Sequence, residues 1–156
     1  GGAIMRAVVQ RALSASVTIN GGETRSIGRG LAVFLGVVKG DTEREADVLA
    51  GKLSGLRVFS DEADKMNLSL SDAGGQVLLI PNFTLGTDCK KGRRPSFDLA
   101  APPDRARELF LYFADRLGEL GVPVVTGEFG ADMRVPVDND GPVTIILDTE
   151  KLGGTT

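Results

Sequence analysis

The sequence predicts an α+β fold in which mostly antiparallel or mixed β-sheets form a barrel-like sandwich with two helices on one side. Candidate strands clearly outnumber the two segments with helical periodicity. The length of 156 residues suits one domain, and no internal repeat, low-complexity tract or interdomain linker interrupts the chain. Residues 1–4 are interpreted as a tag remnant before Met5, and 5–156 as the single domain.

Strands and one hairpin are expected at the beginning of the chain. A strand-like pattern starts at Arg6, and residues 15–19 alternate with a period of two. The turn sequence at 20–22 is Asn-Gly-Gly, which predicts a hairpin between 15–19 and 23–27. The continuous apolar run 31–38 has the length of a buried strand.

The first helix is expected to begin after Thr42. Thr42 and Glu45 have the spacing of a capping box, and apolar residues then recur with helical spacing as far as Leu56. Residues 57–60 are predicted to form another strand, and the polar stretch 61–71 a loop.

The second half of the chain is expected to begin with a strand, a long loop and a helix. Residues 76–80 predict a buried strand that Pro81 interrupts, followed by a long polar loop over 86–98. The second helix should start near the prolines at 102–103 and stop at Gly121.

Three further strands are expected near the C-terminal end. They are predicted at 124–129, 132–137 and 143–148, and residues 138–142 should form the turn between the last two. More strands than helices, with the helices on one side, give the α+β assignment.

Composition excludes several kinds of chemistry. The chain has no histidine and one cysteine, Cys89. Histidine acid–base catalysis, Ser-His and Cys-His nucleophiles, and zinc sites built from histidine or several thiolates are therefore excluded. We expect no metal and no other cofactor. No internal disulfide can form, which suits a cytoplasmic location, and no apolar run reaches the ~18 residues that a membrane span needs.

The first candidate site lies at the end of the predicted core strand, at residues 81–85. Pro81 removes a ladder donor, so the chain must leave the sheet there or run at its edge. The backbone N–H groups of Asn82, Phe83 and Thr84 could then face a cleft and stabilise an oxyanion, and Thr84 adds a hydroxyl. The alternative is a simple strand end.

The second candidate is the predicted turn Asn139-Asp140-Gly141-Pro142. Proline has no N–H, so this tip is rich in carbonyl acceptors relative to donors. Such a surface suits an ammonium group, for example the α-amine of an amino acid. The alternative is an ordinary hairpin turn.

The third candidate is a basic segment in the 86–98 loop. Lys90, Lys91, Arg93 and Arg94 fall within five residues and could contact nucleic-acid phosphates. The alternative is a solvated loop. The formal charge of the chain is −3, which argues against indiscriminate nucleic-acid binding but leaves a local contact patch open.

At these residues the chain resembles the D-aminoacyl-tRNA deacylases, enzymes that hydrolyse D-amino acids and mischarged glycine from tRNA. The resemblance extends from Met5 to about Asp148 and consists of many short motifs in one order. The motifs are Gln10-Arg11, Ala15-Ser16-Val17, Phe59-Ser60-Asp61, Lys65-Met66-Asn67, Phe83-Thr84-Leu85, Arg94-Pro95-Ser96-Phe97, Ala131-Asp132-Met133 and Asn139-Asp140-Gly141-Pro142-Val143-Thr144.

The resemblance implies a homodimer with active sites at its interface, acting on the 3′ end of aminoacyl-tRNA. One subunit would contribute Phe83 and Thr84 as catalytic residues and Met133 to the pocket. The other would insert a Gly-cisPro element, Gly141-Pro142, held by Arg11. The carbonyls of this element would take the α-amine and exclude an L side chain. Hydrolysis would depend on main-chain donors and the 2′-OH of the terminal adenosine, without a metal.

One motif departs from the family pattern. Pro81-Asn82 stands where the family usually has Ser-Gln, which changes the side chains that could bind the substrate while leaving the backbone role of Phe83 and Thr84. We therefore take a D-aminoacyl-tRNA deacylase as the leading hypothesis, with Asn82 as a substrate-binding residue. The rivals are a non-catalytic nucleic-acid-binding module on the same fold and a plain dimeric scaffold.

Overall fold

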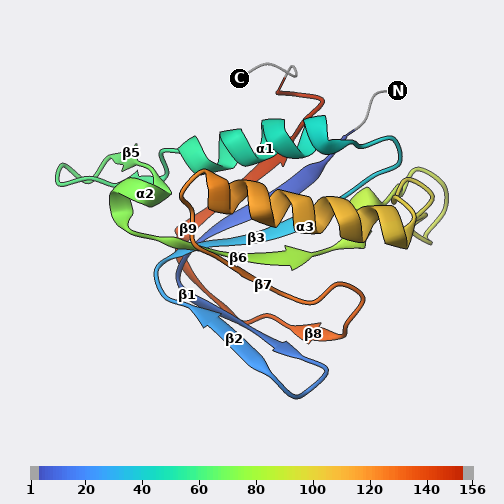
Figure 1. Ribbon diagram of the computed structural model, residues 1–156, viewed down its shortest axis with the longest axis horizontal. Coiled ribbons are helices and arrows are strands. Elements are labelled where there is room, and N and C mark those ends of the chain that lie inside the picture. The colour runs from blue at the N-terminus through green and yellow to red at the C-terminus, as the bar shows by residue number, and fades with distance from the viewer. Residues whose placement is uncertain (1–3, 153–156) are drawn as a thin grey trace.

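The computed structural model, which describes residues 4–152, places two helices over one face of a twisted sheet (Figure 1). The helices α1 (Glu43–Gly55) and α3 (Pro103–Glu119) run side by side above the strands. This confirms the predicted α+β class with two helices on one side. Of the predicted tag remnant 1–4, only Ile4 belongs to the described residues.

The main sheet combines antiparallel and parallel pairs. Its path is β2-β1-β3-β6-β7, and β8 and β9 also pair with β1. The β3–β6 and β6–β7 pairs are parallel, and the others are antiparallel. The strands are β1 (Arg6–Ile19), β2 (Thr24–Ile27), β3 (Gly30–Gly36), β6 (Gln76–Pro81), β7 (Val124–Thr126), β8 (Met133–Arg134) and β9 (Val137–Asp148).

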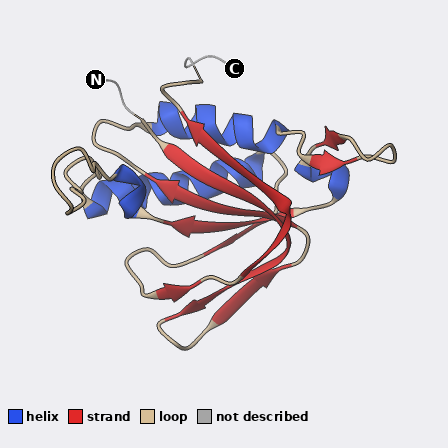
Figure 2. Ribbon diagram, turned by 180° about the vertical axis from the view of Figure 1, so that it is seen from behind, coloured by secondary structure: helices blue, strands red, loops and turns tan. Residues whose placement is uncertain are grey.

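The long strand β1 bends the sheet into a nearly closed barrel. Its first half lies between β3 and β9, whereas its second half pairs with β2 on one side and with β8 and β9 on the other. Seen from behind, the strands fan into a part under the helices and a lower lobe (Figure 2). Arg25 of β2 donates from Nη1 to the Thr126 carbonyl of β7 (2.8 Å), which links the two edges of the lobe.

Each face of the sheet has its own apolar core. Under the helices, Val9 and Val33 pack in one cluster with Leu49 of α1 and Phe113 of α3. Alternate residues face the other way, and Val17 belongs to a second cluster inside the lobe. Because β-strand side chains alternate between faces, strands covered on both sides read as continuous apolar runs.

Local signals set the helix ends as predicted. At the start of α1 the Thr42 N–H donates to Glu45 Oε2 (2.7 Å), and Thr42 Oγ1 accepts from the Arg44 N–H (3.3 Å). Pro103 is the first residue of α3, where its missing N–H costs no hydrogen bond. Gly121, just beyond the last turn, has a φ of +85°, which glycine adopts without strain.

Two segments differ from the prediction. The expected loop 61–71 contains β5 (Met66–Leu68), which pairs with the two-residue strand β4 (Phe59–Ser60), and the start of α2 (Leu70–Ala73). The Ser69 N–H donates to Asp72 Oδ2 and the Asp72 N–H donates to Ser69 Oγ, which caps the start of α2. The polar composition of 61–71 predicted a loop because it masked this capping pair.

The predicted turn 138–142 is also wrong, because these residues belong to β9. Ala12 pairs with Asn139 and Gln10 with Thr144, so residues 140–143 lie opposite Arg11 alone and form a bulge. A bulge keeps the ladder of hydrogen bonds on both sides of an insertion, whereas a turn would end it.

The neighbouring strands are shorter than expected: β7 ends at Thr126, and β8 has two residues. No helix within residues 4–152 is long and apolar enough to cross a membrane.

The buried Asp41 makes folding stability depend on pH. Its side chain accepts the Val38 N–H through Oδ2 (2.8 Å), while Oδ1 has no partner in the described part of the chain. Burial raises the pKa of the Asp41 carboxyl to about 6, against an ordinary value of about 3.9, and the Glu45 and Asp148 carboxylates act in the same direction.

Replacing Asp41 with Asn should therefore stabilise the protein at neutral and alkaline pH. A raised carboxyl pKa means that ionisation opposes folding, so the penalty is absent below pH 4, develops between pH 4 and 6, and is complete above pH 6. We expect Asp41→Asn to be more stable at pH 8 by about 1–3 kcal/mol and similar to the unaltered protein at pH 4. Urea unfolding at both pH values measures this. A variant that is less stable at pH 8 would contradict it.

Candidate active site

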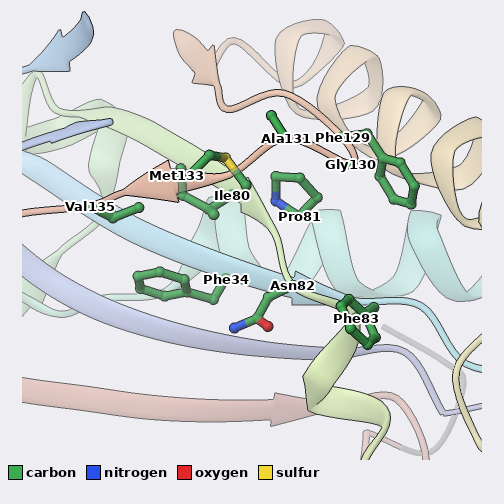
Figure 3. Close-up of a pocket in the computed structure, with 10 residues that line it drawn as sticks. All are labelled: Phe34, Ile80, Pro81, Asn82, Phe83, Phe129, Gly130, Ala131, Met133 and Val135. Carbon is green, nitrogen blue, oxygen red and sulfur yellow. The ribbon is translucent and has the colours of Figure 1, made fainter. Parts of the chain in front are cut away.

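A cavity of about 390 Å³ opens where β6 ends (Figure 3). This volume lies within the range of small-molecule sites. Three of the residues proposed from the sequence line it together, namely Asn82, Phe83 and Met133. The other lining residues are Phe34, Ile80, Pro81, Phe129, Gly130, Ala131 and Val135.

The chain leaves the sheet directly after Pro81, as predicted from the missing N–H. Pro81 is the last residue of β6 to pair with β3, opposite Leu35. The Asn82 N–H still donates to the Leu35 carbonyl (2.8 Å), and the chain then turns into a short 3₁₀ helix, η1 (Phe83–Gly86). The strand end therefore fixes where this helical turn begins.

The η1 turn packs closely against β3. A Cβ on Gly36 would lie 2.6 Å from Leu85 Cβ, so only glycine permits this approach. Arg6 donates from Nη1 to the Leu85 carbonyl (3.1 Å) and from Nε to the Asp148 carboxylate (3.1 Å). A tight contact on one side and a charged donor on the other hold the turn beside the cavity.

Phe83 and Thr84 occupy the first two positions of η1. The first N–H groups of a helical turn have no acceptor within that turn. Neither N–H donates to a residue elsewhere in the described chain. Phe83 lines the cavity, whereas Thr84, the next residue, is not among its lining residues. Two successive backbone donors are thus available at and next to the cavity, and such donors can stabilise a negatively charged oxygen.

The side chains of Asn82 and Thr84 are joined to each other. Thr84 Oγ1 donates to Asn82 Oδ1 (2.6 Å), and the Thr84 carbonyl accepts from Thr87 Oγ1. The Thr84 hydroxyl proton is therefore already used, while the Asn82 NH₂ group remains free to donate. Figure 3 shows the amide nitrogen of Asn82 on the side of Phe34.

Sequence reasoning missed two aromatic residues of the cavity. Phe34 lies in the apolar run that predicted a buried strand, but it is only half-buried and lines the cavity. Phe129 was expected in a strand, and it lies instead in the loop after β7, with its ring 6.4 Å from that of Phe110. An alternating pattern would have marked Phe34, but the strand is apolar on both faces.

Gly141 and Pro142 form the tip of the β9 bulge, and the peptide bond between them is cis. Arg11 lies beneath this tip with its side chain only 11% exposed. Its Nε donates to the Asp140 carbonyl (3.1 Å) and lies 3.3 Å from the Asp140 carboxylate, while Nη1 donates to the Val58 carbonyl (2.7 Å). This partly buried guanidinium of β1 thus ties the tip to β1 and to the segment at Val58.

Within one chain, the tip and the cavity lie apart. The tip is opposite Arg11 of β1, whereas the end of β6 is level with Ala7, because Ala7 pairs with Leu35 and Leu35 with Pro81. Four residues along the strands are roughly 13 Å, and the three strand spacings from β9 to β6 are roughly 14 Å. A single chain therefore does not bring Gly141 and Pro142 to Phe83 and Thr84.

An exposed apolar row leads across the sheet to the cavity. Ile146 of β9, 71% exposed, pairs with Val8, and Val8 pairs with Phe34, which lines the cavity. Figure 2 shows this face of the strands without a helix over it in the described chain.

The basic segment lies in the loop between η1 and α3. Lys90, Lys91, Arg93 and Arg94 are all exposed, and none of these side chains forms an ion pair within residues 4–152. Cys89 beside them is a free, exposed thiol. Nowhere in the same range do three or more histidine, cysteine, aspartate or glutamate residues gather as a metal site would require.

Comparisons with known proteins agree with the motifs. The family model described as D-Tyr-tRNA(Tyr) deacylase matches residues 8–148. A D-aminoacyl-tRNA deacylase of Geobacter sulfurreducens is 53% identical over 152 residues, which are 97% of this chain and 100% of that protein. A D-aminoacyl-tRNA deacylase of Lacticaseibacillus casei is 58% identical over 146 residues, which are 94% of this chain and 99% of that protein.

Two solved structures have the same fold. A c-Myc DNA unwinding element binding protein has a TM-score of 0.86 at 42% identity, over 91% of this chain and 97% of that one. A probable eukaryotic D-amino acid tRNA deacylase has a TM-score of 0.81 over 93% of this chain and 99% of that one, and at 18% identity it supports the fold alone. The chain therefore belongs to the D-Tyr-tRNA(Tyr) deacylase family, as its motifs predicted, and it is a hydrolase of D-aminoacyl-tRNA.

Proposed function

We propose that the chain acts as a homodimer in which each active site combines the cavity of one subunit with the Gly141-Pro142 tip of the other. Its substrates are the 3′ ends of tRNAs that carry a D-amino acid or mischarged glycine, and it acts in the cytoplasm. The proposal rests mainly on one observation: the tip and the backbone donors of Phe83 and Thr84 lie too far apart in one chain to hold the same substrate.

The exposed apolar row supports the dimer. Ile146, Val8 and Phe34 give the uncovered sheet face a continuous apolar strip that ends at the cavity. Contiguous apolar surface of this kind is typical of interaction sites. A two-fold interface across this face brings the β9 tip of each subunit toward the cavity of its partner.

The chemistry follows from the donors and acceptors at the two elements. The carbonyls of the tip accept the α-ammonium group, and a D-amino acid or glycine then turns only hydrogen toward the tip, whereas an L side chain collides with it. Water adds to the ester carbonyl, and the N–H groups of Phe83 and Thr84 stabilise the oxyanion. Collapse breaks the ester bond, and the ribose oxygen leaves with the proton that the attacking water gave up.

The side chains divide the remaining work. Because the Thr84 hydroxyl donates to Asn82, we assign Thr84 a backbone role and Asn82 the side-chain donor to the substrate. Met133 and Phe34 supply the apolar wall, and Arg11 positions the tip. The four basic side chains of the loop at 90–94 provide contacts to tRNA phosphates.

Single-turnover hydrolysis of D-Tyr-tRNA and L-Tyr-tRNA tests the proposal. We expect release from D-Tyr-tRNA more than a hundredfold faster, about 2.7 kcal/mol in activation free energy, because the tip excludes the L side chain. EDTA should leave the rate unchanged. Equal rates for the two substrates, or release from neither, would contradict the chiral mechanism.

A second function has one observation in its favour. The structurally similar protein at 42% identity is named for DNA binding, and the basic loop at 90–94 has free charges for such a contact. A non-catalytic nucleic-acid-binding module would bind duplex DNA with steep salt dependence and would release no amino acid from D-Tyr-tRNA. Measuring both properties on the same preparation separates the two functions.

A further inference from the structure

A second cleft adjoins the first cavity on the far side of Phe83. It has a volume of about 530 Å³, and Phe83, Phe129 and Gly130 line both spaces. Its own walls come from Lys39, the loop before α3 and the start of that helix. A ligand that is held in the first cavity can thus continue past the Phe83 ring into the second cleft without leaving the surface.

Two exposed aromatic rings meet in this cleft. Phe83 is 56% exposed and Phe97 is 43% exposed, and their centroids lie 5.4 Å apart with the rings tilted by 71°. Such rings offer flat apolar faces to solvent. Proteins that bind single-stranded nucleic acid use side chains of this kind as platforms on which bases stack.

The charges around the cleft suit a phosphodiester. Lys39 lines the cleft, and the loop that presents Phe97 also carries the four free cations at 90–94. Asp98 is the carboxylate among the lining residues. The cations exceed this one negative charge, so the approach to the cleft attracts a polyanion.

We propose that the cleft binds the base of the nucleotide that precedes the terminal adenosine of the tRNA, stacked on Phe97. This inference rests on the proposed function, which places the aminoacylated adenosine in the first cavity. Two spaces divided by one aromatic side chain match two successive nucleotides, and Lys39 in the wall of the second cleft supplies a cation for the phosphodiester of such a ligand. Phe97 is thus a specificity residue that senses a tRNA end rather than a free aminoacyl-nucleoside.

Three non-hydrolysable ligands test this proposal. Each carries D-alanine in amide linkage on a 3′-amino-3′-deoxyadenosine. The first is the nucleoside alone, the second is preceded by cytidine phosphate, and the third is preceded by the same phosphate on an abasic ribose. Calorimetric affinities for the unaltered protein should be about 5- to 150-fold higher for the cytidine ligand than for the abasic ligand, which is the usual range for stacking one base.

The variants at position 97 separate stacking from a structural role. Phe97→Leu should abolish the preference for cytidine over the abasic ligand and leave the affinity for the nucleoside alone unchanged. Leu111→Ala, at a similarly exposed site on α3, should leave all three affinities unchanged. Because the chain has no tryptophan, Phe97→Trp provides a single tryptophan, excited apart from Tyr112, whose fluorescence the cytidine ligand should quench and the abasic ligand should not.

Three results would overturn the proposal. The first is an equal affinity of the unaltered protein for the cytidine and abasic ligands. The second is a preference for the cytidine ligand that survives in Phe97→Leu. The third is a loss of affinity in Phe97→Leu that is as large for the nucleoside alone as for the cytidine ligand. The last result would assign Phe97 to the terminal adenine or to loop structure. Binding is measured without turnover, so a failure of the deacylation assay would reject the proposed function and leave this test intact.

Discussion

A heterodimer of two nearly inactive variants, Phe83→Pro and Gly141→Ala, should regain about half of the activity of the unaltered dimer, because one of its two interface sites is intact. The Gly141→Ala subunit supplies a normal cavity, and the Phe83→Pro subunit supplies a normal tip. Co-expression with two different affinity tags yields the heterodimer, and single-turnover release from D-Tyr-tRNA measures its activity.

Phe83→Pro is designed to remove one backbone donor without disturbing η1. Proline is favoured at the first position of a helical turn, and Asn82 before it, with φ −143° and ψ 88°, lies outside the α region that a following proline disfavours. We expect the rate to fall by about 10²- to 10³-fold, the usual effect of losing one oxyanion donor. Phe83→Ala is the control, because it removes the ring and keeps the N–H, so its loss of rate should be smaller.

Gly141→Ala should inactivate the tip because of its backbone conformation. Gly141 has a φ of +127°, and a Cβ there would lie 3.0 Å from Val143 N and 3.3 Å from Arg11 Nη2. The tip must shift, and the carbonyls that hold the α-ammonium group shift with it. If the isolated heterodimer is no more active than either variant, the active site does not combine elements from two subunits.

Pro142→Ala should weaken the discrimination between D- and L-aminoacyl-tRNA by at least tenfold, or about 1.4 kcal/mol. Alanine restores an N–H to a tip that otherwise presents only acceptors, so a donor now faces the ammonium group. The less confined tip also admits some L side chains. The ratio of kcat/KM for D-Tyr-tRNA to that for L-Tyr-tRNA measures the effect, with Pro136→Ala, outside the tip and cavity, as the matched control. An unchanged ratio would remove the tip from the selection of chirality.

Local signals in the sequence were enough to predict the elements of the fold that have strong boundaries. Thr42 and Glu45 marked the start of α1, the prolines at 102–103 marked α3, and Pro81 marked where β6 ends. Each of these residues acts through its own backbone or that of a close neighbour, so its effect on the fold can be predicted from the local sequence.

Features that depend on distant partners could not be predicted in the same way. Residues 138–142 have the composition of a turn, but Arg11, 129 positions away from Asp140, holds them as a bulge within β9. Phe34 looked like core because β3 is apolar on both faces, one packed in the cluster under the helices and the other against the cluster inside the lobe. The hydrogen bond from Thr84 Oγ1 to Asn82 Oδ1 could not be predicted either, because a hydroxyl can donate to any of several nearby acceptors.

Strand β9 carries both the Gly141-Pro142 tip and Ile146, the most exposed residue of the apolar row. In the proposed dimer, the segment that attracts a second molecule also delivers the missing half of its reaction centre. Dimer formation and catalysis then depend on each other. A dissociated subunit would keep the N–H donors of Phe83 and Thr84 but would lack the partner's tip carbonyls that bind the α-ammonium group. Newly made subunits would therefore hydrolyse no aminoacyl-tRNA until they had associated, so no cavity would act without the tip that rejects L-amino acids.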